Sequence, residues 1–206
     1  YSFVLNNADR LKHLVREAMA YEMAQLKMDM PMVSKSDFYI PQSCIFTYNG
    51  ESKTQIVYEK NVYQGYLSSA APRSMPEVKF EKFCERAESV EWWYKNGDKG
   101  NEYLSIVYQD NSEKQKLFYP DYIICAKGEI WIIETKGGFD RSGTSHDIDK
   151  FTPKKFEVLK KYLNEHGLKG GIVRNDDSTD ELCICMENYS DDIQSDDWKI
   201  LSDFVK

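Results

Sequence analysis

Residues 118–137 read FYPDYIICAKGEIWIIETKG and contain two apolar runs separated by a short turn. The runs at 122–124 and 130–133 are rich in β-branched and aromatic residues, which are typical of β-strands. Lys127 and Gly128 form the expected centre of the turn, because glycine readily adopts the positive φ that a tight hairpin needs. The stretch therefore predicts a β-hairpin with a fixed pairing register.

This register gathers three charged side chains at one end of the hairpin. Asp121 faces Glu134, with the two Cβ atoms about 5 Å apart. Lys136 lies two residues beyond Glu134 and therefore shares its face of the strand. Two carboxylates so close repel each other, and a divalent cation would remove the conflict. Mg²⁺ commonly takes one or two carboxylates and completes its shell with water and substrate phosphate, so we expect Mg²⁺ here rather than a strand end with ordinary solvated charges.

The pattern Pro-Asp, followed by Glu-x-Lys with the Glu thirteen residues after the Asp, resembles the signature of the PD-(D/E)xK nuclease superfamily. The segments YEKNVYQG at 58–65 and WWYKNG at 92–97 extend the resemblance. Together they are similar to the C-terminal endonuclease domain of type III restriction enzyme Res subunits and related helicase-nucleases. The similarity covers roughly residues 55–165. It implies an α/β fold with a restriction-endonuclease-like core, a mixed central sheet flanked by helices, and an N-terminal extension of a helix and a hairpin.

The resemblance also implies roles for the hairpin residues. Asp121 and Glu134 would hold Mg²⁺, or Mn²⁺ in its place, with the backbone carbonyl of Thr135 as a further ligand. Lys136 would orient or help deprotonate the attacking water and stabilise the developing negative charge. The implied activity is a Mg²⁺-dependent DNA endonuclease that leaves a 5′-phosphate and a 3′-hydroxyl.

Two amphipathic helices are expected, one before the hairpin in the sequence and one after it. The first begins near Pro76, where Glu77 best matches the helix carboxylate of the family and Glu81, one turn later, is the alternative. A solvated helix face is an equal alternative for a single glutamate. The second helix spans 153–163 and ends near Gly167.

The second helix supplies the lysines expected to contact DNA. Lys155 matches a lysine of the family that contacts the region of the scissile phosphate, and Lys154 is the neighbouring alternative. Lys150 precedes the helix and is expected to bind the nucleic acid as well. A solvated amphipathic face explains these lysines equally well.

Composition limits what the chain can bind. The 206 residues carry a net charge of −7, which is unfavourable for a DNA-binding domain because phosphate affinity comes largely from lysine and arginine. Basic residues concentrate in 150–174, and acidic residues dominate from 176 onward. An isolated domain of this kind is expected to bind double-stranded DNA weakly. The resemblance implies delivery by an upstream helicase/ATPase region of the same polypeptide and, in a restriction system, a DNA methyltransferase subunit. The alternative function is a catalytically silent nuclease-like module that binds nucleic acid or a partner protein.

Other features of the sequence bear on the cellular location of the protein and on its domain organisation. Five cysteines, an odd number lying mostly in apolar runs, indicate reduced thiols and a cytoplasmic location. The sequence contains no run of 18 apolar residues, so it predicts no membrane span. The chain begins with Tyr1, which we interpret as part of a larger polypeptide. We expect an N-terminal helix and linker over 1–43, as part of a connection to a missing upstream domain, and a nuclease domain over 44–206.

Other elements follow from local patterns. A helix is expected over 7–28 and a hairpin between 44–48 and 55–63. The further expected segments are a loop at 64–75, strands at 90–95 and 103–109, a glycine-containing loop at 137–150, strands at 170–174 and 182–186, and a closing helix over 198–205.

Overall fold

The computed structural model describes the chain in seven segments. These are residues 13–14, 16–19, 38–50, 55–98, 103–109, 115–137 and 152–205. The chain divides into two compact units, residues 1–34 and 35–206. The described residues of the first unit are helical, and the rest of the helix expected over 7–28 lies outside the described residues.

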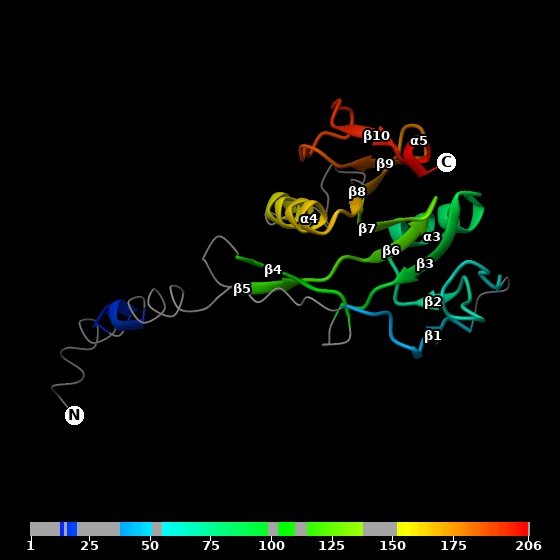
Figure 1. Ribbon diagram of the computed structural model, residues 1–206, viewed down its shortest axis with the longest axis horizontal. Coiled ribbons are helices and arrows are strands. Elements are labelled where there is room, and N and C mark those ends of the chain that lie inside the picture. The colour runs from blue at the N-terminus through cyan, green and yellow to red at the C-terminus, as the bar shows by residue number, and fades with distance from the viewer. Residues whose placement is uncertain are drawn as a thin grey trace. The chain divides into compact units, whose positions relative to one another are not determined.

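A six-stranded mixed sheet forms the centre of the second unit (Figure 1). Its strand order is β10-β9-β8-β7-β6-β3. Strands β7 and β8 are parallel, and the other neighbours are antiparallel. The strands are β3 (Val90–Lys95), β6 (Tyr122–Ala126), β7 (Glu129–Lys136), β8 (Lys169–Asp176), β9 (Glu181–Cys185) and β10 (Trp198–Ile200). The expected mixed central sheet is confirmed.

The hairpin β6–β7 has the predicted register. Tyr122 pairs with Ile133, and Ala126 pairs with Glu129 at the turn. Lys127 and Gly128 have φ values of 51° and 71°, which are the positive values that a tight two-residue turn requires. Asp121 and Glu134 are the next positions along this register, beyond the last formal pair.

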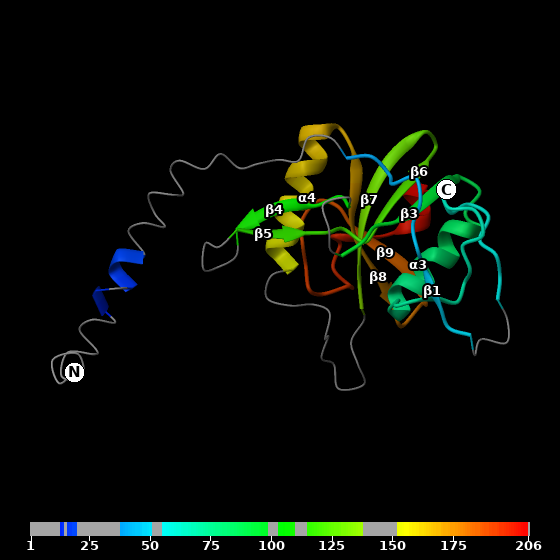
Figure 2. The same ribbon diagram turned by 90° about the horizontal axis from the view of Figure 1, so that it is seen from below.

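Two helices cover opposite faces of the sheet (Figure 2). Helix α3 (Met75–Arg86) buries Phe80 and Cys84 against one face, and helix α4 (Thr152–His166) buries Leu159 and Leu163 against the other. The crossover from β7 through α4 to β8 explains the parallel pair, because parallel neighbours need a long connection. A short helix α5 (Leu201–Val205) ends the described chain.

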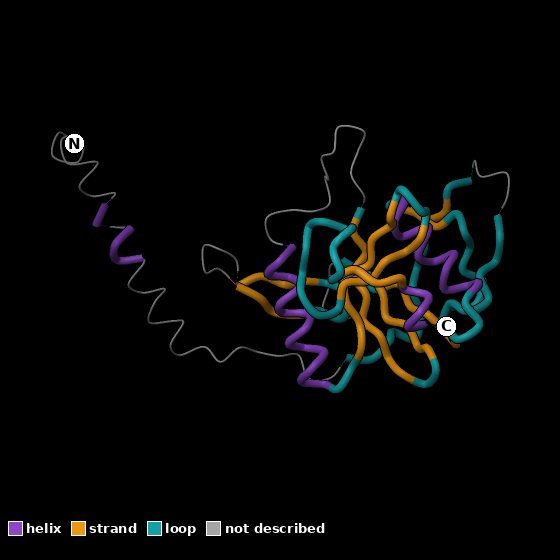
Figure 3. Tube along the Cα trace, turned by 90° about the horizontal axis from the view of Figure 1, so that it is seen from above, coloured by secondary structure: helices purple, strands orange, loops and turns teal. Residues whose placement is uncertain are grey.

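Strands β4 (Ile106–Gln109) and β5 (Gln115–Phe118) form a separate two-stranded ribbon beside α4 (Figure 3). The strand expected at 103–109 therefore exists in part but does not join the central sheet. Ile106, Tyr108 and Phe118 point into the core shared with α4.

The hairpin expected between 44–48 and 55–63 is wrong. Strand β1 (Thr47–Tyr48) pairs instead with β2 (Ala70–Ala71), which falls in the stretch expected to be a loop. The intervening chain folds back on itself, because Tyr58 N donates to Tyr66 O and Ser68 N donates to Ile56 O. After this fold-back, the chain at Ala70–Ala71 lies beside β1 and pairs with it.

The closing helix expected over 198–205 is correct only for its second half. Trp198–Ile200 form strand β10, which pairs with Cys183–Cys185 of β9. Burial of the Trp198 ring against Phe156 and Ile172 favours this arrangement. The glycine-containing loop expected at 137–150 lies outside the described residues from 138 onward. Among the described helices, none is long and apolar enough to cross a membrane.

Candidate metal and nuclease site

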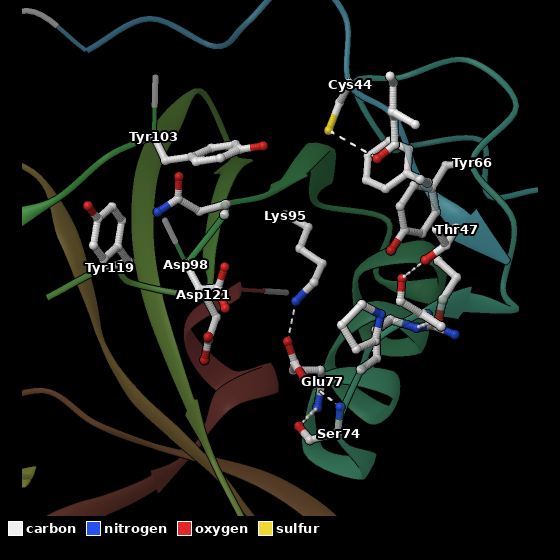
Figure 4. Close-up of a pocket in the computed structure, with 18 of the residues that line it drawn as sticks. Cys44, Thr47, Tyr66, Ser74, Glu77, Lys95, Asp98, Tyr103, Tyr119 and Asp121 are labelled. Carbon is white, nitrogen blue, oxygen red and sulfur yellow. Dashed lines mark hydrogen bonds and ion pairs between the residues drawn. The ribbon is translucent and has the colours of Figure 1, made fainter. Parts of the chain in front are cut away.

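A cleft of about 580 Å³ opens where β3 ends and β6 begins (Figure 4). The first turn of α3 contributes Glu77 and the end of β3 contributes Lys95. The segment before β6 contributes Tyr119 to Asp121. These three parts of the sequence meet at the cleft, and one of its walls carries the Pro-Asp pair.

Asp121 is held by the residue between Glu134 and Lys136. Its Oδ2 accepts hydrogen bonds from the Thr135 backbone N and from Thr135 Oγ1, both at 2.7 Å. Burial raises the pKa of Asp121, and the two bonds from Thr135 offset part of that rise. The bonds tie the carboxylate before β6 to the end of β7. The backbone N of Thr135 thus serves as a hydrogen-bond donor to Asp121. The expected role of the Thr135 carbonyl as a metal ligand stays a prediction.

Glu134 and Lys136 form the second part of the site. Glu134 is 4% exposed, and its carboxylate lies 2.6 Å from Lys136 Nζ. Burial, together with the nearby charge of Asp121, raises the pKa of Glu134 to about 8, although Lys136 and Lys155 act in the opposite direction. The buried Oε2 of Glu134 has no hydrogen-bond partner among the described residues.

These observations fit a divalent cation. Both carboxyl groups have raised pKa values, the charge of Asp121 opposes the ionisation of Glu134, and one buried oxygen of Glu134 lacks a donor. Hard oxygen ligands of this number suit Mg²⁺, which needs only one or two carboxylates from the protein. Within the described segments, no three His, Cys, Asp or Glu side chains group into a metal site. A cation here would therefore complete its shell with water or substrate oxygens.

Glu77 lies in the same cleft as Asp121, and its surroundings are now defined. It is the third residue of α3 and forms a capping box with Ser74. It also pairs with Lys95. Burial alone would raise the pKa of Glu77, but Lys95 and the bonds to Ser74 bring it below its ordinary value. Glu77 is therefore charged and faces the cleft, as Figure 4 shows.

Glu81, the alternative helix carboxylate, is fully buried away from the cleft lining. It forms an ion pair with Arg73 and accepts hydrogen bonds from the hydroxyls of Tyr66 and Tyr122. Arg73 also donates to the carbonyls of Ser68 and Ala70. Glu81 thus anchors the loop before α3, which leaves Glu77 as the candidate for the site.

Of the candidate lysines near α4, Lys155 lies close enough to Glu134 to affect its pKa. Lys155 is partly buried, its charge lowers the pKa of Glu134, and its Nζ lies 6.0 Å from the centre of the Phe118 ring. Lys154 is also partly buried. Lys150 lies outside the described residues, so its proposed DNA contact stays a prediction.

Two residues of the site were not singled out from the sequence, although both belong to the block WWYKNG. Lys95 enters the cleft beside Glu77. Asn96 is 5% exposed, and its side chain binds the backbone of the chain before β4 and before β6. Asn96 Nδ2 donates to Leu104 O and to Pro120 O, both at 2.8 Å, and Asn96 Oδ1 accepts from Leu104 N. The WWYKNG block was the sequence signal that could have pointed to these two residues. Their roles depend on contacts with segments that are distant in sequence, which the block alone does not reveal.

The segments that carried the sequence resemblance lie side by side. Val62 N donates to Trp93 O, and Trp93 N donates to Lys60 O. Glu85 of α3 accepts from Trp93 Nε1 and from the backbone N of Lys60. The segment 58–65 therefore supports the edge of β3 that leads into the cleft.

Comparison with known proteins gives one match. The family model described as YagJ family matches residues 77–174, a range that begins in α3 and ends in β8. It includes every candidate residue named above from Glu77 to Lys155. No curated protein and no solved structure matches the chain.

Proposed function

We propose that this chain is a Mg²⁺-dependent DNA endonuclease domain that hydrolyses phosphodiester bonds and leaves a 5′-phosphate and a 3′-hydroxyl. The observation that carries the proposal is the pair of opposed carboxylates, the buried Glu134 and the partly buried Asp121, beside Lys136. Burying charges without compensation is costly, so such a pair is maintained where a cation binds. Perturbed carboxyl groups next to a cleft are also frequent at catalytic sites.

Asp121, Glu134 and the Thr135 carbonyl would hold the metal. The bound ion would supply a Lewis acid for the phosphate and lower the pKa of its water. Lys136 supplies a fixed ammonium next to Glu134, where it can orient the attacking water and offset negative charge that develops on the phosphate. Glu77 remains ionised in the cleft and can accept a hydrogen bond from water near Asp121. Lys155 adds positive charge on the α4 side of Glu134.

The same proposal includes the setting of the domain. We infer that it is the cutting module of a type III restriction enzyme or a related helicase-nuclease, with double-stranded DNA delivered by an upstream helicase/ATPase region. The net charge of −7 supports a dependence on such delivery, since few phosphate contacts are available to the domain alone. A DNA methyltransferase subunit is the further partner in a restriction system, and the setting is cytoplasmic.

A second function is favoured by one specific observation. The bonds from Thr135 to Asp121 hold the start of β6 and the end of β7 together, and Lys136 pairs with Glu134, so neither contact needs a metal. A catalytically silent module that binds nucleic acid or a partner protein would keep this arrangement.

The test is nicking of supercoiled plasmid by the chain with Mg²⁺ or Mn²⁺, beside the double variant Glu134→Ala, Lys136→Ala. We expect metal-dependent nicking that the double variant loses. Calorimetric titration with Mn²⁺, comparing wild type with Asp121→Ala, separates the two functions if no nicking occurs. Binding of Mn²⁺ that needs Asp121 supports a nuclease that requires its motor, whereas no binding supports the silent module.

A further inference from the structure

The cleft extends well beyond the proposed metal ligands. Tyr103, Tyr119 and Asp98 lie on the same side as Asp121, and Tyr66 and Thr47 lie on the opposite side (Figure 4). Lys95 and Glu77 lie between the two sides. The volume of about 580 Å³ falls within the range of pockets that hold small organic ligands. Of the proposed metal ligands, only Asp121 lines this cleft, on one side of it.

Two aromatic rings line the cleft on that side. Tyr103 and Tyr119 are both partly buried and line the cleft next to Asp121. The Tyr103 ring lies flat against the chain at Gly97, where a Cβ atom would come within 2.3 Å of the ring. Glycine at 97 thus lets the ring approach the backbone closely, and this contact fixes the ring at the wall.

The charges of the cleft do not suit a track for phosphates. Its acidic residues are Glu77, Asp98 and Asp121, and its basic residues are Lys95, which pairs with Glu77, and Arg73, which pairs with Glu81. Affinity for nucleic acid in this space must therefore come mainly from stacking on the aromatic rings rather than from phosphate contacts.

A paired base within a duplex cannot reach such a pocket, because its faces are stacked and only its edges and the backbone are accessible. Enzymes that hold a base in a pocket act on single strands or turn the nucleotide out of the helix. We propose that the cleft binds one unpaired nucleobase next to the scissile phosphate, so that the substrate is single-stranded DNA or a locally opened duplex. Both the base and the position of the phosphate rest on the proposed function, because that function makes nucleic acid the ligand of this cleft.

The test measures binding without cleavage. Fluorescence anisotropy with EDTA present gives the Kd for a fluorescein-labelled single-stranded oligonucleotide and for the blunt duplex of the same sequence. The variants are the double substitution Tyr103→Leu, Tyr119→Leu and the ring-retaining pair Tyr103→Phe, Tyr119→Phe. The matched control is Tyr39→Leu, because Tyr39 is 78% exposed and does not line the cleft.

We expect the wild type to bind the single strand about tenfold more tightly than the duplex, and the double leucine variant to lose about tenfold in single-strand affinity. The phenylalanine pair and Tyr39→Leu should keep the wild-type affinity. Tyr103 packs partly against the α4 core, so thermal melting accompanies each variant. If the double leucine variant does not fold, Tyr119→Leu alone replaces it, since the described cores do not include Tyr119.

Duplex binding as tight as single-strand binding, or a double leucine variant with unchanged affinity, would overturn the inference. The result is independent of the plasmid assay. Selective binding of the single strand without any cleavage would keep the base pocket and remove the nuclease. Cleavage of duplex with no dependence on the two tyrosines would keep the nuclease and remove the pocket.

Discussion

At the scale of the residue, Glu134 is the most perturbed carboxyl group of the proposed site. Burial is the main cause of its raised pKa, and the charge of Asp121 adds to it. The folded chain therefore binds a proton at Glu134 more tightly than the unfolded chain does. By linkage, this group makes the metal-free protein less stable as the pH rises from the ordinary value of 4.5 to about 8.

The substitution Glu134→Gln tests this cost directly. Glutamine keeps the shape but cannot ionise, so the variant should not lose this stability and should melt roughly 5 °C above the wild type at the alkaline end of the range. The measurement is thermal unfolding in EDTA across this pH range, with the exposed Glu157→Gln as control. Added Mn²⁺ should raise the melting temperature of the wild type but not that of Glu134→Gln, because the bound ion stabilises only a fold that holds it. Parallel pH profiles of wild type and Glu134→Gln would contradict the prediction.

At the scale of the element, Asn96 joins three segments that meet at the cleft. Its side chain binds Leu104 before β4 and Pro120 before β6, and its backbone N donates to Asp121 O at 2.8 Å. These bonds link the end of β3 to the Pro-Asp corner. Asn96 therefore holds Asp121 in position and is not itself one of the proposed metal ligands.

The change Asn96→Ala should weaken Mn²⁺ binding about tenfold and also lower stability, because it leaves the buried Leu104 and Pro120 groups without their partner. Calorimetry gives the affinity, and thermal melting gives the stability. The control is Leu163→Ala, which opens a cavity in the α4 core and should cost on the order of 2–5 kcal/mol of stability while leaving the Mn²⁺ affinity intact. Equal Mn²⁺ affinities in wild type and Asn96→Ala would show that the role of Asn96 is only structural.

The elements also show where sequence patterns are informative. The register of β6–β7 is local, since a two-residue turn and two apolar runs define it, and it was correctly predicted. The pairing of β1 with β2 depends on how the chain between them folds back, which no local pattern contains. The same holds for β10, whose three residues become a strand only because β9 offers an edge. The long-range pairs were therefore missed.

The candidate site divides in the same way. The carboxylates of the hairpin and Lys136 follow from spacing along the chain. The choice of Glu77 over Glu81 needs the tertiary surroundings, because both lie one turn apart on the same helix. Only the fold shows that Arg73 neutralises Glu81 while Glu77 faces the cleft. Lys95 and Asn96 likewise gain their contacts from segments that are distant in sequence.

At the scale of the whole molecule, the proposed function requires an acidic chain to bind a polyanion with few cations. Of the α4 lysines, Lys160 pairs with Glu187 and Lys161 pairs with Glu165. Lys154 and Lys155 lie on the part of α4 nearer the carboxylates, where Lys155 influences Glu134. We therefore expect only about three phosphate contacts, with base stacking supplying the rest of the affinity.

The salt dependence of binding measures this number. For a single-stranded oligonucleotide, the plot of log Kobs against log salt concentration should have a slope of about −2, since each phosphate contact contributes about −0.7. The double variant Lys154→Ala, Lys155→Ala should reduce the magnitude of the slope by about 1.4, whereas Lys160→Ala on the same helix should leave it unchanged because Glu187 already neutralises that lysine. A slope steeper than about −5 would instead require a continuous basic track, and the weak electrostatic contribution inferred from the net charge would then be wrong.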